Sequence, residues 1–420
     1  EGHVMLGVVG YGGGIWHSWF DRDLTVVGRA LVKGPDGRLT PRLVHVPRAI
    51  CRIPTLAIHL SKADERSSFA PNLQSHFPPM LATKIKEALW DSAPASRGGG
   101  GGGAGAGAAM AAVAAPTAAG VSAPASLSSK HTPLLMKAVA KSLGLSDAEV
   151  AAGAIVDFEL QLSDTQPSAI IGACEEFVSS GRLDNQGSCY CASKALLESL
   201  AGSDGEARFR ADSSVRMITM FDHEEVGSLS AQGADSAFFP DTLTRVGVGL
   251  GCGDVFALKA RSFQISSDMA HAVHPNYSDR HDPANKPRLG GGLVMKHNAN
   301  QRYATNAIGA SMVRRFAELA GSDGVGVQEF CVKADSACGT TIGPITAGGS
   351  GIRTVDVGPP QLSMHSCREL MAVADVRASV KLFVSAFAHF EGVSKAVSET
   401  DGDAEGRDPF WAQPGNGWGQ

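Results

Sequence analysis

Phe221-Asp222-His223-Glu224-Glu225-Val226-Gly227-Ser228 places two adjacent carboxylates where an apolar run meets a glycine turn. The preceding residues, 215–221, are β-branched and apolar, which predicts a buried β-strand. Ligands in open α/β sheets bind outside the carboxyl ends of strands, so both glutamates are expected at a cleft. Side chains of strand neighbours point to opposite faces, so Glu224 and Glu225 can converge only if the strand ends before Gly227. One would then bind a metal while the other transfers a proton; a solvated acidic turn is the alternative.

Two further predicted strands end near side chains that can bind metals. Residues 263–267 form a short apolar strand pattern that ends at Asp268, with His271 close behind. Residues 353–357 form another, and His365 follows in the turn that we expect to enter the last helix. Each has an ordinary alternative, because an aspartate before a helix is often an N-cap and a histidine at a helix start is often a surface residue.

A fourth candidate is Asp184, which precedes an apolar run with helical spacing at residues 189–200. Oxygen and nitrogen ligands of this type suit zinc, manganese or cobalt. Three carboxylates and a bridging hydroxide would balance a pair of divalent ions, and such a pair, about 3.5–4 Å apart, lowers the pKa of a shared water towards about 7. Asp184 is our candidate for the bridging carboxylate. The predicted ligand set is Asp184, Glu225, Asp268 and His365.

Several motifs along the chain carry a resemblance to a known family. They are Tyr11-Gly12-Gly13-Gly14-Ile15-Trp16, Trp19-Phe20-Asp21-Arg22-Asp23-Leu24, Ile53-Pro54, Leu56-Ala57-Ile58-His59-Leu60, Asp164-Thr165-Gln166-Pro167, Arg182-Leu183-Asp184-Asn185, Asp222 to Ser228, Asp268 to Tyr277, Gln301-Arg302-Tyr303-Ala304, Cys338 to Pro344 and Met364-His365-Ser366. On these motifs, which together are highly specific, the chain resembles the aspartyl aminopeptidases of the M18 metallopeptidase family from about residue 7 to residue 389.

The resemblance implies removal of N-terminal aspartate or glutamate from peptides, by two divalent ions per subunit, zinc first and manganese or cobalt as alternatives. It also implies a homo-oligomer built from dimers, a dodecamer in this family. For single residues it implies the following roles. Among the metal ligands, Asp184 bridges the two ions, Glu225 and His365 bind one of them, and Asp268 binds the other. Glu224 is the general base, and His271 stabilises the oxyanion. Lys296 and Tyr303 hold the acidic side chain of the substrate, and His59 reaches the active site of a partner subunit.

One expected ligand does not appear in this sequence. The family has a second metal-binding histidine, in a His-Thr-Asp-Ser-Pro type segment, upstream of the glycine-rich motif at Tyr11. This sequence begins at Glu1, and the neighbours of His3 do not match that segment. We therefore expect a truncated N-terminus and do not expect His3 to bind metal.

Composition agrees with a large hydrolase. A chain of 420 residues predicts two domains. A net charge of −5 gives no basis for binding nucleic acid or a membrane surface. Eight irregularly spaced cysteines form neither a disulfide framework nor a zinc ribbon and indicate a reducing compartment, so a cytoplasmic location is expected. No segment has the roughly 20 apolar residues of a membrane span.

The positions of the predicted ligands suggest the domain layout. Residues 1–13 would begin the catalytic domain, 14–161 would be an inserted, β-rich dimerisation domain, and 162–391 would complete the catalytic domain. Within the insert, residues 23–33 and 43–60 have strand patterns, and 133–143 has helical spacing after possible caps at Ser128 and Ser129. The Gly/Ala-rich stretch 92–126 and the tail 392–420 are expected to be disordered. The predicted fold is α/β, with a mixed central sheet flanked by helices.

Two other functions remain open from the residues alone. One is a related two-metal aminopeptidase or deacylase of different specificity. The other is an inactive, assembled scaffold, because one metal ligand of the family is missing. Metal content per subunit separates the enzymes from the scaffold.

Overall fold

The computed structural model describes residues 2–91, 127–322 and 324–399, which belong to two compact units. Unit 1 spans residues 1–9 and 19–167, and unit 2 spans residues 10–18 and 168–420. Residues 2–9 belong to unit 1 and not, as the predicted layout has it, with residues 168–399, because β1 (His3–Met5) pairs with β4 (Met80–Thr83). The predicted loop 92–126 and residues 400–420 lie outside the described residues. Within the described ranges, no helix is both long and apolar enough to cross a membrane.

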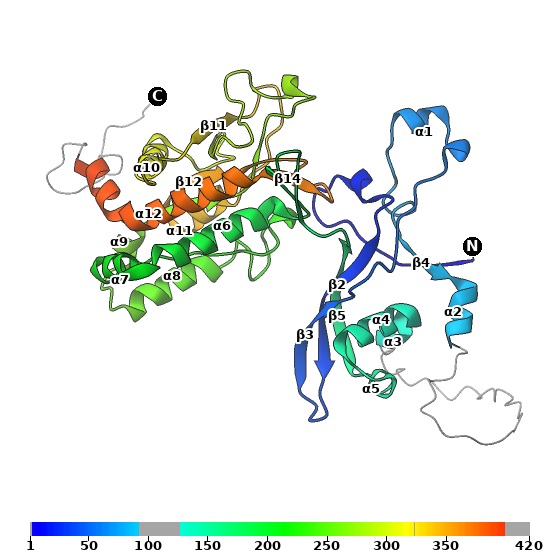
Figure 1. Cartoon of the computed structure of the whole chain (residues 1–420). Helices are drawn as coiled ribbons and strands as arrows, with labels where there is room; N and C mark the ends of the chain where they lie inside the picture. The colour runs from blue at the N-terminus through cyan, green and yellow to red at the C-terminus, as the bar shows by residue number, and fades with distance from the viewer. Residues whose placement is uncertain (1, 92–126, 323, 400–420) are drawn as a thin grey trace, which may run out of the picture. The chain divides into compact units, whose positions relative to one another are not determined.

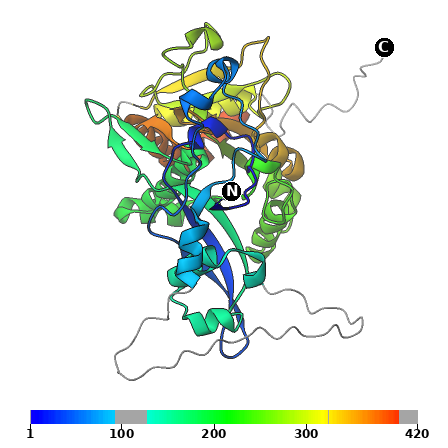
Figure 2. The same cartoon turned by 90° about the vertical axis from the view of Figure 1, so that its right-hand side faces the viewer.

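Unit 1 is built on an antiparallel sheet of three strands, β3 (Leu39–His45), β2 (Leu24–Lys33) and β5 (Ile155–Asp164), seen in Figures 1 and 2. Helix α4 (Pro133–Leu143) packs on β3 through an apolar stripe that includes Val139. Its N-cap is Thr132, whose side chain accepts a hydrogen bond from the N–H of Leu134, so the predicted caps at Ser128 and Ser129 are wrong. Its remaining helices are α1 (Ala63–Ser67), α2 (Lys84–Asp91), α3 (Leu127–Lys130) and α5 (Asp147–Ala151).

The segment around His59 differs from its predicted strand. Residues Ile58–Leu60 form a short 3-10 turn, and His59 in it is exposed. An alternating sequence becomes a strand only where a neighbouring strand accepts its hydrogen bonds, and Leu60 here donates to the carbonyl of Ala57 within its own turn.

Unit 2 contains a mixed sheet of four strands in the order β11 (Val327–Cys331), β10 (Leu293–His297), β12 (Arg353–Gly358) and β8 (Phe263–Ser267). β10 is parallel to β11 and antiparallel to β12, which is parallel to β8. Its buried residues Leu293, Met295, Val355 and Val357 pack against α6 (Leu183–Ser199), α10 (Ala307–Glu318) and α12 (Val373–Glu399). Burial of each such side chain contributes about 1.5–3 kcal/mol. On the other face, α11 (Gly343–Ser350) begins beside Asp356. The predicted mixed α/β fold is confirmed.

A second sheet continues the first. Its order is β6 (Ala169–Ile171), β7 (Phe177–Ser180), β14 (Glu369–Ala372), β13 (Pro360–Leu362) and β9 (Ala270–His271). The parallel pair β8 and β12 passes directly into the parallel pair β9 and β13. At the junction, a Cβ on Gly358 would lie 1.7 Å from the carbonyl oxygen of Asp268, so only glycine fits there. The junction brings Asp268 to the edge of both sheets.

Three predictions about unit 2 are wrong. Residues 215–221 form no strand; they line a cavity of about 1080 Å³ together with residues of β8, α8 (Phe238–Gly249) and α12. An apolar run forms a strand only where a partner strand pairs with its backbone. Residues 215–221 have no such pairing, and they line the cavity instead. His365 lies in the turn between β13 and β14, not before the last helix. Helix α12 continues to Glu399, so residues 392–399 are not a disordered tail.

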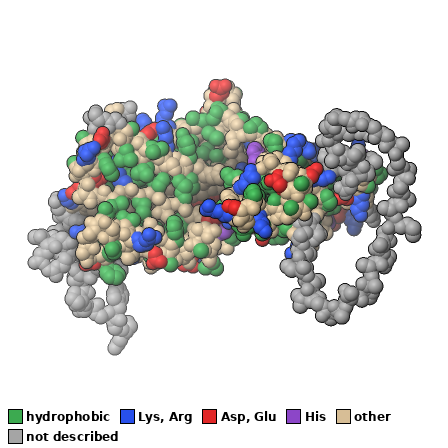
Figure 3. Space-filling model, turned by 90° about the horizontal axis from the view of Figure 1, so that it is seen from below, with side chains coloured by type: hydrophobic (Ala, Val, Ile, Leu, Met, Phe, Trp, Pro, Cys, Tyr) green, Lys and Arg blue, Asp and Glu red, His purple; other side chains and the backbone are tan. Residues whose placement is uncertain are grey.

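Hydrophobic side chains gather on the side of unit 2 where α8 lies (Figure 3). Two short helices flank it, α7 (Gly202–Ala211) and α9 (Val255–Ala260). Phe256 on α9 is 82% exposed, and Val248 and Leu250 at the end of α8 are 64% and 65% exposed. Large exposed apolar groups are frequent at protein–protein interfaces.

Candidate metal centre

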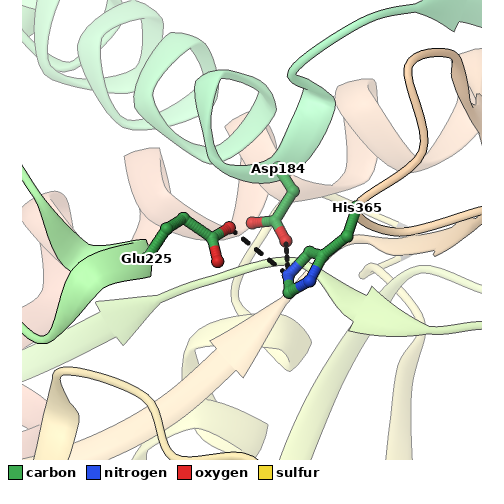
Figure 4. A group of neighbouring side chains, drawn as sticks. All are labelled: Asp184, Glu225 and His365. Atoms are coloured by element: carbon green, nitrogen blue, oxygen red, sulfur yellow. Dashed lines mark ion pairs between the residues drawn. The ribbon is translucent and has the colours of Figure 1, made fainter. Parts of the chain in front are cut away.

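Asp184, Glu225 and His365 converge in unit 2 (Figure 4). Nε2 of His365 lies 3.4 Å from Oδ2 of Asp184 and 3.3 Å from Oε1 of Glu225. One ligand atom from each residue lies within 4.8 Å of the other two. Two carboxylates and an imidazole around one point form a donor set that suits Zn²⁺ and leaves a coordination position for a ligand. The three residues therefore fit a divalent metal ion.

Each of the three residues lies where regular structure is interrupted. Asp184 has non-helical angles, φ −80° and ψ 112°, inside the first turn of α6. Glu225 lies in a 3-10 turn, Glu224–Val226, which follows a left-handed His223 and ends at Gly227 with φ 104°. His365 is itself left-handed, with φ 65°. Such backbone positions turn side chains away from the adjoining element and are frequent at functional sites.

The glycine-rich motif that begins at Tyr11 forms one wall of this centre. Nδ1 of His365 lies 2.9 Å from the carbonyl oxygen of Gly13. A carbonyl only accepts hydrogen bonds, so Nδ1 carries the proton and Nε2 faces the two carboxylates. A Cβ on Gly12, at φ 70°, would lie 3.0 Å from both Cβ and the carbonyl oxygen of Glu225. The motif thus orients His365 and leaves room for Glu225, a role that the sequence alone did not reveal.

The carboxylates of the centre repel one another. Burial, followed by the charges of Asp268, Glu225 and Asp184, raises the pKa of Glu224 to about 7. Burial likewise raises the pKa of Asp184, against a hydrogen bond to His365 that lowers it. The hydrogen bond to Asp184 raises the pKa of His365 to about 9. This excess of negative charge is what bound cations would neutralise.

Asp268 does not join the three clustered residues but pairs with Lys296. Lys296 is 3% exposed, and its ammonium donates to Oδ2 of Asp268 at 2.9 Å and to the carbonyl of Met269 at 2.7 Å. After burial, the charge of Asp268 also raises the pKa of Asp184. Asp268 therefore connects Lys296 to the cluster.

Tyr303 lies next to Lys296. The Lys296 ammonium lies 5.6 Å from the centre of the Tyr303 ring, a cation–π contact. The Cys338 thiol donates to the Tyr303 hydroxyl at 3.4 Å. Burial, followed by this cysteine, raises the pKa of Tyr303, so its hydroxyl stays protonated. The thiol contact was not predicted, although Cys338 begins the family motif Cys338 to Pro344.

His271, the proposed oxyanion residue, ends β9 and retains an exposed surface. Desolvation, followed by the Lys296 charge, lowers its pKa to about 4. The imidazole is therefore neutral at pH 7 and can donate one hydrogen bond. His59 belongs to unit 1, whereas the other predicted site residues all belong to unit 2.

The chain is similar to known proteins both in sequence and in structure. The sequence profile of the family described as Aminopeptidase I zinc metalloprotease (M18) matches residues 1–387. A probable aspartyl aminopeptidase of Ricinus communis is 44% identical over 403 residues, covering 95% of this chain and 78% of the relative. The structure titled as the Ape4 and Nbr1 complex has 40% identity and a TM-score of 0.79, covering 94% of this chain and 69% of that one. The mApe1 dodecamer of Saccharomyces cerevisiae has 25% identity and a TM-score of 0.69, covering 95% and 76%.

Proposed function

The chain belongs to the Aminopeptidase I zinc metalloprotease (M18) family, and we propose that it removes N-terminal aspartate or glutamate from peptides. Membership makes it a metallo-aminopeptidase and confirms the resemblance that its motifs carry. The cluster of Asp184, Glu225 and His365 is the observation that carries the metal-dependent part of this proposal. The relative from Ricinus communis, described as a probable aspartyl aminopeptidase, supports the acidic specificity.

We infer that two divalent ions, zinc foremost, bind each subunit. Glu225 and His365 would hold one, Asp268 the other, and Asp184 both. The charge of Asp268, which acts on Asp184 and raises its pKa after burial, supports a shared site, because neighbouring carboxylates need cations to stay ionised together. When bound, divalent ions supply Lewis acidity, which polarises a peptide carbonyl and acidifies water.

The side chains around the metal residues supply the other roles. Glu224, adjacent to Glu225, takes a proton from the attacking water and returns it to the leaving amine. His271 donates a hydrogen bond to the oxygen that becomes negative at the scissile carbonyl. A general base and an oxyanion donor must both lie beside the metal residues. The charges of Asp184, Glu225 and Asp268 all act on Glu224, which supports its role as the base.

Lys296 selects the acidic side chain. Its ammonium has three N–H groups, of which Asp268 and Met269 accept two among the described residues. The third N–H is available to a substrate carboxylate, and the protonated Tyr303 hydroxyl is a second donor nearby. A charge-assisted hydrogen bond of this kind is stronger than one between neutral groups.

We further propose a homo-oligomer in a cytoplasmic, reducing environment. The structure forms no disulfide among the eight cysteines, all of them in the described ranges. Around His59, the side chains of Leu56, Ile58 and Leu60 are 55%, 62% and 71% exposed, which suits a surface that a second subunit covers. His59 would then contribute to the site of that partner. Light scattering at micromolar concentration that finds only the 43.5 kDa monomer would contradict the assembly.

A direct assay tests the activity. Purified protein is incubated with Zn²⁺ and with four matched peptides that begin with Asp, Glu, Ala or Leu. We expect release of the first residue from the Asp and Glu peptides, and its loss after dialysis against a chelator. Equal cleavage of all four would instead favour a related aminopeptidase of broad specificity.

A further inference from the structure

Glu369 connects the backbones of two of the three clustered residues. It is the first residue of β14 and is 3% exposed. Its Oε2 accepts a hydrogen bond from the backbone N–H of Asp184 at 2.9 Å, and its Oε1 accepts one from the backbone N–H of His365 at 2.7 Å. One buried carboxylate therefore joins the start of α6 to the turn before β14, at two residues that are 181 positions apart in sequence, the difference between 365 and 184.

Both backbones need such support. Asp184 interrupts the first turn of α6, and His365 lies in a tight turn with φ 65°, a conformation that is costly for a residue with a side chain. Neither N–H belongs to a strand ladder or to the regular part of a helix. A buried N–H without an acceptor is destabilising, and Glu369 is the acceptor for both.

We propose that Glu369 is a positioning residue for the metal site, and this rests on the proposed function. By accepting both N–H groups it fixes the separation between Asp184 and His365, so that Nε2 and Oδ2 remain 3.4 Å apart. β14 carries this carboxylate on a paired strand, since Glu369 opposes Ser180 of β7. The distance between the two ligands is thus set by a strand of the sheet, and not only by the first turn of α6 and the turn that carries His365.

The test uses Glu369→Gln, which keeps the size of the side chain but replaces one acceptor oxygen by an NH₂ group. That NH₂ group cannot accept a hydrogen bond from the backbone N–H that it then faces. The affinity for Zn²⁺ is measured by competition with a chelator. We expect a dissociation constant raised about 10- to 100-fold, the usual effect of losing a residue that supports a ligand. An unchanged dissociation constant would overturn the proposal.

Asp375→Asn is the matched control. Asp375 is also fully buried, and its carboxylate also accepts two backbone N–H groups, from Gly290 at 2.7 Å and Gly292 at 2.8 Å. It touches none of the three clustered residues in the described structure, so its Zn²⁺ dissociation constant should stay within about threefold of wild type. If both variants weaken Zn²⁺ binding equally, the effect is general destabilisation and the proposal is wrong.

A measurement on the wild type covers the case in which Glu369→Gln does not fold. Hydrogen exchange of the metal-free protein should show slow exchange at the amides of Asp184 and His365, and fast exchange there would overturn the proposal.

A wild type without Zn²⁺ affinity would overturn both the metal site and this role. A wild type that binds Zn²⁺ but cleaves no peptide would overturn the proposed function alone, because the affinity comparison would still decide the role of Glu369.

Discussion

The Nδ1 atom of His365 lies 2.9 Å from the carbonyl oxygen of Gly13, although 352 residues separate them in sequence. This contact fixes which imidazole nitrogen faces Asp184 and Glu225. It also explains why a run of glycines accompanies a metal site: the backbone has to approach two ligands closely.

Gly12→Ala should weaken Zn²⁺ binding and destabilise the protein. The new Cβ would press on Glu225 at 3.0 Å, and φ of 70° is unfavourable for alanine, at a cost of about 1–2 kcal/mol. Gly37→Ala is the control, because Gly37 has φ 79° with nothing within 4 Å of the added Cβ. We expect both variants to lose stability in thermal unfolding, but only the first to lose Zn²⁺ affinity. Equal Zn²⁺ affinities would show that Gly12 does not shape the site.

Glu224→Gln and Glu225→Gln should fail in different ways. Loss of the general base should reduce turnover by about 10² to 10⁴-fold and leave bound zinc unchanged. Loss of a ligand should remove zinc and activity together. Metal analysis and kinetics on the two purified variants check this. A Glu224→Gln protein that loses its zinc, or that retains activity within tenfold of wild type, would contradict the assigned roles.

Lys296→Met should remove the preference for acidic residues. With a neutral substrate the buried ammonium lacks one partner, at a cost of about 2–5 kcal/mol. Since about 1.4 kcal/mol is a factor of ten, wild type should favour Asp and Glu peptides by about a hundredfold or more in kcat/KM. The variant should lose activity on them and keep slow cleavage of Leu and Ala peptides.

Arg302→Met is the control for this comparison. Arg302 is an exposed cation one residue from Tyr303, so its removal should leave the preference intact. If Lys296→Met keeps the preference for acidic residues, selectivity has another source, and His59 of a partner subunit is the next residue to change.

Asp375 should make stability depend on pH. Burial raises its pKa to about 6, above the ordinary value of 3.8, although the N–H groups of Gly290 and Gly292 oppose the shift. A raised pKa in the folded state means that Asp375 contributes stability below about pH 4, which is lost as pH rises through 6. The unfolding free energy of wild type minus that of Asp375→Asn should fall by roughly 2–3 kcal/mol between pH 4 and pH 7. Urea titrations that give a constant difference would contradict this.

The sequence predicted the strands β8 and β12 correctly, because both are short runs that contain apolar residues at strand spacing. It predicted residues 215–221 as a strand for the same reason, and here it failed, since pairing depends on a partner strand that the local pattern does not specify. The same limit applies to the expected strand at His59.

The side chains of Asp184, Glu225 and His365 were predicted to meet, and they do. Their supports were not predicted. Glu369 accepts a hydrogen bond from a backbone N–H 185 residues away as well as from one four residues away, and a buried glutamate leaves no periodic or spacing signal. Gly13 acts through its carbonyl oxygen, which every residue has. Only the folded backbone shows such contacts.

The central claim is that Asp184, Glu225 and His365 hold the catalytic metal. Anomalous diffraction at the zinc edge, from crystals grown with Zn²⁺, tests it most directly. We predict an anomalous peak within bonding distance of Nε2 of His365 and of carboxylate oxygens of Asp184 and Glu225, at about 2.0–2.2 Å. A map with no peak among these three side chains, or with the zinc bound elsewhere, would contradict the account.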